Sequence, residues 1–400
     1  MKEGWTIKKL GDICKVAPSK NRAKVKDIDP LLEVSFMPME DLTIGNKYAY
    51  PSKRLLYKDI ASGYTYFEEG DILIAKVTPC FENGKLAIVK KLAHGIGFGS
   101  SEYIVIRNSV QEIISDYIYY YLRTDVFRQN GKKLMVGACG LKRIPKEYIA
   151  SLSIPFPILL QEQQRIVKIL DAEFAKIDAL KANAEKSLQA AKDLFRTILK
   201  EKFNNNSWQL STIGVECKTG AGGTPNKMYK EYYEGGDIPW LRSGEVCSRN
   251  IYNTELFITQ AGVDNSSAKW FPKSTVVVAM YGATAGQVGI LQIPSTTNQA
   301  VCGIFPNKKY LPDFIYYVIL SQKEYLVAQA TGNAQSNISQ KKIKGVSIPI
   351  IEIGDQKRIV SQLDNLDECC KVLQENYNKT IVLCEDLKQA LLRKAFNGEL

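Results

Sequence analysis

The residues of this sequence that are best suited to bind a ligand lie in polar loops, each of which follows a short apolar run. The loops are KVTPCFENGK (76–85), KKLMVGACGLKR (132–143), YGATAGQ (281–287), TNQA (297–300) and GNAQSN (332–337). Lysine and arginine bind phosphate oxygens or the edge of guanine, whereas asparagine and glutamine pair with the edge of adenine. These residue types favour contact with nucleic acid, and the alternative is a set of ordinary solvated loops.

The candidate contact residues form one set in each half of the chain. In the first half they are Lys76, Thr78, Asn83, Lys85, Lys142 and Arg143. In the second half they are Tyr281, Thr284, Gln287, Asn298, Gln299, Asn333 and Gln335. For each of them a structural or merely solvated role is the competing interpretation. Trp5 and Trp208 lie in apolar alternation and fit core packing better than contact with a ligand.

Motifs for catalysis are missing from the sequence. Neither Gly84-Lys85 nor Gly131-Lys132 has the upstream glycine of a GxxxxGK phosphate-binding loop. There is no HExxH, no GxSxG and no NPPY-type or DPPY-type tetrapeptide, and the only histidine is His94. The glycine-rich AGGTPN (221–226) has no strand-GxGxxG-helix context and is interpreted as a turn. We therefore expect no catalytic residues, no metal site and no cofactor in this chain.

The net charge of +11 is unevenly distributed along the 400 residues. Residues 1–157 carry +7 and residues 207–351 carry +4, whereas residues 158–206 carry +2 and residues 352–400 carry −2. Basic globular segments suit a phosphate-bearing partner such as DNA, although a merely soluble basic surface explains the charge equally well. Nine scattered cysteines, no apolar run of ~18 residues and no signal peptide together predict a cytoplasmic protein.

The sequence contains one unit twice. Corresponding stretches follow in the same order, at an offset that drifts only from 203 to 193. They include WTIKKLGDICK (5–15) with WQLSTIGVECK (208–218), GDILIAKVTPCFENGKLAIV (70–89) with STVVVAMYGATAGQVGIL (274–291), and EQQRIVKILD (162–171) with DQKRIVSQLD (355–364). The repeat indicates a tandem duplication of a unit of roughly 200 residues, which is too long for a solenoid repeat.

Each unit is expected to begin with a small α+β or α/β domain, at residues 1–157 and 207–351. Short β-branched runs bounded by glycine, proline and asparagine predict buried strands at 72–77, 102–107, 275–280 and 301–305. Helices are predicted at 115–130 and 311–330, each with an aspartate near its first turn. These strands and helices must position the polar loops.

A long helix is expected after each domain, at residues 158–206 and 352–400. The stretches from Gln161 to Phe203 and from Gln356 to Phe396 contain no proline or glycine, and their apolar residues alternate by four and three. The predicted apolar seam consists of Val167, Leu170, Phe174, Ile177, Leu188, Phe195, Ile198, Leu363, Leu366, Leu373, Tyr377, Leu387 and Leu391.

Two helices of equal length with this spacing favour an antiparallel coiled coil with pseudo-twofold symmetry. Each helix is then a spacer ~60 Å long at ~1.5 Å per residue. The alternative is a pair of amphipathic helices that each pack on their own domain. The repeat also predicts that each half, 1–206 or 207–400, folds and dimerises through its own helix.

This organisation resembles the specificity subunit of type I restriction-modification systems. The resemblance spans essentially the whole chain, and the alternation of globular domain and long helix is highly specific to that family. It is carried by Trp5, Leu10, Gly11, Trp208, Ile213, Gly214, the run GGTPN…GGDIPWLRSGEV (222–246), TPCFENGK (78–85), and the segments 153–171 and 347–364, which lead from SIP into the long helices.

The resemblance implies two target recognition domains, each reading one half of a split, asymmetric double-stranded DNA site, with the paired helices as a ruler. It also implies two methyltransferase subunits docked on this chain, together with restriction-translocation subunits. Adenine methylation from S-adenosylmethionine, and cleavage that uses ATP and magnesium, would belong to those partners. The alternative hypothesis is a non-catalytic protein-binding adaptor with two basic domains, whose binding would depend far less on salt than DNA binding does.

Overall fold

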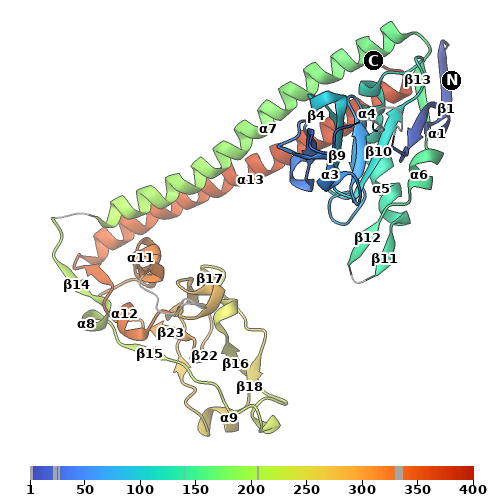
Figure 1. Cartoon of the computed structure of the whole chain (residues 1–400). Coiled ribbons are helices and arrows are strands. Elements are labelled where there is room, and N and C mark those ends of the chain that lie inside the picture. The colour runs from blue at the N-terminus through green and yellow to red at the C-terminus, as the bar shows by residue number, and fades with distance from the viewer. Residues whose placement is uncertain (1–2, 21–24, 26–27, 139, 205–206, 329–336) are drawn as a thin grey trace. The chain divides into compact units, whose positions relative to one another are not determined.

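A computed structural model of the chain describes residues 3–20, 25, 28–138, 140–204, 207–328 and 337–400. The chain divides into two compact units (Figure 1), one made of residues 1–184 and 379–400 and the other of residues 185–378. Each unit thus contains one globular domain and half of each long helix. The sequence predicted four segments, namely two domains and two separate helices. The structure instead groups each domain with the parts of both helices that pack against it.

The first unit contains two mixed sheets. The larger has the strand order β2 (Cys14–Val16), β10 (Tyr103–Asn108), β7 (Ile72–Ala75), β8 (Leu86–Val89) and β4 (Tyr48–Ala49). The smaller has the order β5 (Lys53–Leu56), β3 (Glu33–Met37), β9 (Ile96–Gly99) and β6 (Thr65–Glu68). The pairs β4–β8 and β3–β9 are parallel, and the other pairs in these two sheets are antiparallel.

The second unit repeats the topology of these two sheets strand for strand. Its larger sheet has the order β15 (Thr219–Ala221), β23 (Val301–Ile304), β20 (Val276–Ala279), β21 (Val288–Leu291) and β17 (Asn250–Ile251). Its smaller sheet has the order β18 (Phe257–Ile258), β16 (Ile238–Leu241), β22 (Ser295–Thr297) and β19 (Trp270–Phe271). Again the pairs β17–β21 and β16–β22 are parallel. The predicted duplication and the α+β class are confirmed.

Two short ladders join the beginning of each domain to its end. They pair β1 (Trp5–Lys9) with β13 (Ser153–Pro157), and β14 (Leu210–Thr212) with β24 (Ser347–Pro349). A hairpin of β11 (Val136–Ala138) and β12 (Leu141–Arg143) completes the strands of the first unit. Trp5 and Trp208 pack, partly buried, on the apolar cores of their units, as the sequence predicts.

Short helices pack on the sheets of both units. In the first unit they are α1 (Leu10–Ile13), α3 (Tyr57–Ile60), α4 (Ser115–Leu122), α5 (Asp125–Leu134) and α6 (Lys146–Ser151). In the second they are α8 (Ile213–Glu216), α9 (Gln260–Asp264), α10 (Pro312–Ser321), α11 (Lys323–Ala328) and α12 (Gln340–Lys344). The helices predicted as continuous at 115–130 and 311–330 are each broken once. Thr124 has an extended backbone and its hydroxyl caps α5, which explains the first break.

The central strand of each larger sheet is buried on both faces. Ile72 and Ile74 of β7 contribute to the core under the helices, whereas Leu73 and Ala75 contribute to the core facing the smaller sheet. The strand β20 divides its side chains in the same way. Because such strands have no polar face, the polar side chains near them lie in the loops at their ends.

The long helices are α7 (Leu160–Phe203) and α13 (Ile353–Asn397). In the first unit Asp178 pairs with Lys388 and Lys181 pairs with Glu385, so the partner's number falls as that of α7 rises. In the second unit residues 198–202 of α7 lie beside residues 358–362 of α13. The two helices therefore run antiparallel in both units.

The predicted seam is buried unevenly. Val167, Leu170, Phe174, Ile177 and Leu363 are buried, whereas Leu188, Phe195, Ile198, Leu366, Tyr377 and Leu391 are half-buried. The structure differs at Leu373 and Leu387, which are 41% and 48% exposed. Beside Leu387, Lys388 is the buried residue, with 3% exposure. An α-helix drifts relative to a strict 3.5-residue repeat, so the buried position moves by one residue.

A buried glutamine anchors each long helix to its domain. Gln163 accepts a hydrogen bond from the N–H of Ile114, which precedes α4, and donates to the carbonyl groups of Glu112 and Pro157 at 2.8 Å. Gln356 repeats these contacts with Leu311, which precedes α10, and with two carbonyl groups of the second unit. This explains why both copies contain glutamine at the second position of EQQR and DQKR.

A charged cluster makes a second anchor. Lys47 lies 2.7 Å from Asp116 of α4 and 2.8 Å from Asp171 of α7. In the second unit Arg249 lies 2.5 Å from both Asp313 of α10 and Asp364 of α13. Each cluster joins the edge of the larger sheet, a domain helix and a long helix, so it fixes the orientation of the domain on its part of the helix pair.

Candidate nucleic-acid interface

In the first unit, four of the six predicted contact residues meet at the end of β7. The Lys76 N–H donates to the carbonyl of Glu102, and the Lys76 carbonyl accepts from the N–H of Ile144, both at 2.9 Å. The Thr78 N–H donates to the carbonyl of Lys142, also at 2.9 Å. The loop after β7, the loop after β9 and the hairpin β11–β12 therefore form one surface, which we call the first loop cluster (residues 76–78, 100–102, 136–138 and 140–143).

Charges in the first loop cluster are partly compensated. The Arg143 guanidinium donates to both carboxylate oxygens of Glu102, at 2.7 and 2.9 Å. These hydrogen bonds hold the pKa of Glu102 below its usual range against the opposing effect of burial. Lys76 donates to the carbonyl of Ser101 at 2.8 Å and lies 3.9 Å from Glu102. Lys142, by contrast, is exposed on β12, so it is the basic candidate best placed to meet a phosphate.

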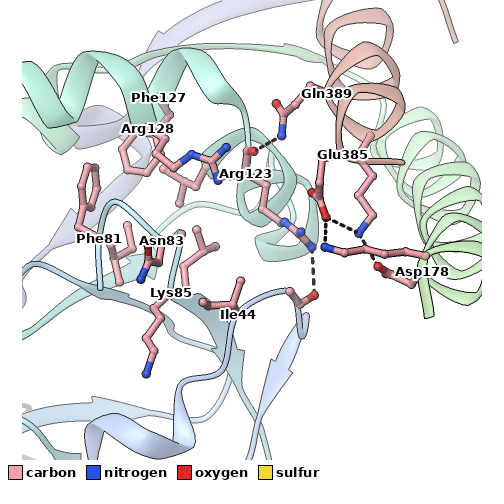
Figure 2. A pocket seen from close by; sticks show the side chains of 17 residues that line it. Ile44, Phe81, Asn83, Lys85, Arg123, Phe127, Arg128, Asp178, Glu385 and Gln389 are labelled. Carbon is pink, nitrogen blue, oxygen red and sulfur yellow. Dashed lines mark hydrogen bonds and ion pairs between the residues drawn. The ribbon is translucent and has the colours of Figure 1, made fainter. Parts of the chain in front are cut away.

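Asn83 and Lys85 lie where the same loop leads into β8, and the Lys85 carbonyl accepts a hydrogen bond from the N–H of Ala75 at 3.0 Å. They line a cavity of about 140 Å³ between this loop, α5 and the long helices of the first unit (Figure 2). Arg123 extends across this cavity and donates to the carbonyl of Gly45 at 3.1 Å. The Lys85 ammonium donates to the carbonyl of Met39 at 3.2 Å. In the structure Lys85 therefore supports the loop, and Asn83 remains an exposed candidate.

In the second unit, the five described candidates lie around the corresponding end of β20. Tyr281, Thr284 and Gln287 belong to the loop between β20 and β21, whereas Asn298 and Gln299 follow β22. The Met280 N–H donates to the carbonyl of Ala300 at 2.8 Å, which brings the two loops together. We call this surface the second loop cluster (residues 281–287 and 298–300). Asn333 and Gln335 lie outside the described residues.

The second loop cluster differs chemically from the first. Tyr281 is 41% exposed, Gln299 is exposed and accepts a hydrogen bond from the Thr224 hydroxyl, and Gln287 accepts from Lys323 at 3.1 Å. Asn298 accepts from the N–H of Ala300 at 3.2 Å and so shapes its own loop. Amide and phenol groups thus replace the ion pair of the first loop cluster.

The glycine-rich stretch 221–226 is not the predicted turn: Ala221 ends β15, and residues 222–226 form an irregular segment that packs closely on its neighbours. A Cβ atom at Gly222 would lie 2.1 Å from the Thr297 carbonyl oxygen, and one at Gly223 would lie 2.3 Å from Ser267. The glycines are needed for this close approach, which places Thr224 beside Gln299.

Sequence reasoning missed three residues of these surfaces: Glu102, Thr224 and Lys323. The loop that holds Glu102 follows β9 as the loop that holds Asn298 and Gln299 follows β22, but Glu102 itself corresponds to Ala300, so the repeat indicated the loop and not the carboxylate. The other two come from segments distant in sequence from the candidates they touch.

The described residues include no group of three or more His, Cys, Asp or Glu side chains that could hold a metal ion. Within the same residues no helix is long and apolar enough to cross a membrane. The eight described cysteines are free thiols.

Comparison with known proteins gives matches in both units. The chain is 35% identical over 197 residues to the EcoAI type I restriction enzyme specificity subunit of Escherichia coli, a match that covers 49% of this chain and 32% of the relative. It is 26% identical over 395 residues to the EcoR124I/EcoR124II specificity subunit of E. coli, covering 88% of this chain and 91% of the relative. This chain thus spans about a third of the first relative and about nine tenths of the second.

A solved structure described as showing complex assembly and conformational transition of the type I R-M system contains a chain with the same fold. The TM-score is 0.83 at 19% identity, and the match covers 100% of this chain and 99% of that one. The model of the type I restriction modification DNA specificity domain matches residues 2–190 and again residues 205–381. These two matches coincide with the two copies of the repeated unit, and the chain belongs to the family of type I restriction modification DNA specificity domains.

Proposed function

We propose that this chain is the specificity subunit of a type I restriction-modification complex, and that each unit recognises one half of a split, asymmetric DNA site. The observation that carries the proposal is the pair of loop clusters at the corresponding ends of β7 and β20. The two surfaces have the same place in the fold but different side chains. A duplicated scaffold with divergent loops suits the recognition of two different base sequences.

The proposed division of labour leaves chemistry to other subunits. Two methyltransferase subunits would dock on this chain and transfer methyl groups from S-adenosylmethionine to adenine. Restriction-translocation subunits would use ATP and magnesium to cleave DNA. The missing phosphate-binding loop and the missing NPPY-type and DPPY-type tetrapeptides support this division.

Methylome sequencing of host cells with and without the gene for this chain tests the proposal. We expect methylated adenines in a two-part asymmetric sequence only in cells that express the chain. An identical methylome in both strains would contradict a role in DNA specificity.

Purified chain provides a second test. Alone it should transfer no labelled methyl group and cut no DNA, with or without S-adenosylmethionine, ATP and magnesium. Its affinity for DNA should fall steeply with salt, with a log–log slope of about −0.9 for each phosphate contact. A salt-independent affinity for proteins, with no affinity for DNA, would support the adaptor hypothesis instead.

A further inference from the structure

The long helices make two ion pairs in the first unit. Lys388 is 3% exposed, pairs with Asp178 and lies 5.5 Å from the centre of the Phe174 ring. One turn away, Lys181 lies 2.6 Å from Glu385. The Lys388 ammonium is almost completely shielded from water, and Glu385 of its own helix lies 4.0 Å away. Loss of the Asp178 carboxylate would therefore leave a buried cation that depends on this longer contact.

The second unit has different residues at the equivalent positions. The repeat offset of 193 makes the following pairs equivalent: Asp178 with Lys371, Lys181 with Gln374, Glu385 with Lys192, and Lys388 with Phe195. Phe195 packs against the apolar core of the second unit. Lys371 pairs with Asp367 of its own helix at 2.6 Å. The ionic contacts between the helices in the first unit thus have no ionic equivalent in the second.

We propose that these charges select pairing of the first helix with the second, and oppose pairing of either half with a second copy of itself. The register of the first unit, applied to two copies of the second helix, places Lys371 opposite Lys388. Applied to two copies of the first helix, it places Lys181 opposite Lys192 and leaves Asp178 against Phe195. Compared with the mixed pair, each self-pair lacks the ion pairs Asp178–Lys388 and Lys181–Glu385. Each self-pair also brings two lysines together, which opposes it.

This selection holds the two different recognition units together in one molecule. The sequence-based expectation that each half dimerises stays a prediction, and under this proposal such self-pairs are weaker than the mixed pair. The apolar seam is common to all three pairings, whereas the charged positions favour only one of them. The inference concerns the helices alone and does not depend on DNA binding.

The test uses the full chain with a specific protease site inserted between Asn204 and Ser207, cut after folding. Cut protein labelled with ¹⁵N is mixed with unlabelled cut protein and held at a temperature at which labelled fragments exchange. Native mass spectrometry then counts the three species, which are the mixed pair and the two self-pairs. We expect the mixed pair to exceed each self-pair by at least about tenfold, which corresponds to ~1.4 kcal/mol. Statistical proportions after exchange would overturn the proposal.

The variant Lys388→Glu should shift the populations toward one self-pair. The introduced carboxylate faces Asp178 in the mixed pair but Lys371 in the self-pair of fragment 207–400, so the self-paired population should rise at least about tenfold. Lys394→Glu makes the same change of charge at an exposed position of the same helix and should leave the populations unchanged. Equal populations in the two variants would contradict the proposal.

The uncut chain gives an independent measurement if Lys388→Glu folds poorly. In a double-mutant cycle of Asp178→Asn and Lys388→Met, the two changes should be coupled by at least about threefold in the unfolding equilibrium constant. Strict additivity would overturn the assigned ion pair.

Discussion

Lys142 and Arg143 are neighbours in sequence, but only the Arg143 side chain is held by an ion pair in the structure. The Arg143 guanidinium is held by Glu102, whereas the Lys142 side chain is exposed. An exposed lysine can meet a phosphate without breaking an existing ion pair. Removing Arg143, by contrast, uncovers a carboxylate in the first loop cluster.

We therefore expect different outcomes for Lys142→Ala and Arg143→Ala. Lys142→Ala should weaken DNA binding uniformly across sequences and make the salt slope shallower by about 0.9. Arg143→Ala should also weaken binding, but the second change Glu102→Gln should restore part of the loss. Fluorescence anisotropy at several salt concentrations measures both effects, with Lys186→Ala on the exposed surface of α7 as control. No restoration by Glu102→Gln would show that Arg143 contacts DNA directly.

The cluster around Lys47 gives a prediction for pH. Burial raises the pKa of Asp116, but the hydrogen bond and charge of Lys47 more than compensate, so this pKa lies below its usual range. A carboxylate with a lowered pKa stabilises the fold above its unfolded pKa of ~3.9 and loses this contribution as the pH falls through the folded value. The contribution is therefore constant near neutral pH and disappears in acid.

Lys47→Met should lower the free energy of unfolding of the first unit at pH 7 by about 1–3 kcal/mol. This is less than for a fully buried ion pair, because water screens the partly exposed Asp171. At about pH 3 the difference between the variant and the wild type should shrink, because the Asp116 carboxyl begins to take up a proton as the pH falls below ~3.9 toward its lowered folded pKa, and a neutral carboxyl gains less from Lys47. Thermal unfolding at both pH values measures this, with Lys53→Met at an exposed position as control. A difference that grows in acid would contradict the cluster.

At the scale of elements, the buried glutamines Gln163 and Gln356 join the long helices to the domain helices. Both side chains are completely buried, and each satisfies one main-chain N–H and two carbonyl groups. A shorter apolar side chain would leave these groups unsatisfied.

Gln163→Ala should therefore destabilise the first unit by about 3 kcal/mol, and Gln356→Ala should do the same in the second unit. The neighbouring exposed residues provide matched controls, Gln164→Ala and Lys357→Ala, which should change stability by less than about 0.5 kcal/mol. Hydrogen exchange at the first turns of α4 and α10 would locate the effect. Equal losses in the matched pairs would show that the glutamines are not anchors.

At the scale of the whole molecule, the long helices are the candidates for a ruler. They are continuous through Phe203 and Asn397, whereas the polar loops of each unit belong to its own domain. If the helices only set distance, their length should change the spacing of the two half-sites and leave the bases in each half unchanged.

A seven-residue insertion between Lys186 and Ala190, matched by one near Tyr377, preserves the heptad phase in both helices. It adds ~10 Å at 1.5 Å per residue, which is about three base pairs at ~3.4 Å each. Methylome sequencing should show intact half-sequences separated by a spacer longer by a few base pairs. Changed half-sequences with the original spacer would show that the helices take part in base recognition.

Local patterns in the sequence determined much of this organisation. The β-branched runs predicted β7, β10, β20 and β23, and the four-and-three spacing predicted two long helices, because backbone periodicity is encoded by near neighbours. The repeat predicted two copies of one topology. The same patterns identified the loops at the ends of β7 and β20, since a strand buried on both faces leaves polar residues only at its ends.

Tertiary structure alone decided which of these residues meet. Arg143 is 41 residues from Glu102, and Lys388 is 210 residues from Asp178, so no local pattern reports either pair. The seam was predicted to include Leu387, but Lys388 is the buried residue, because an α-helix drifts relative to the strict 3.5-residue repeat from which the seam was predicted. Periodicity within a chain fixes which face of an element is apolar, whereas the partner of each charge follows from the register between distant elements.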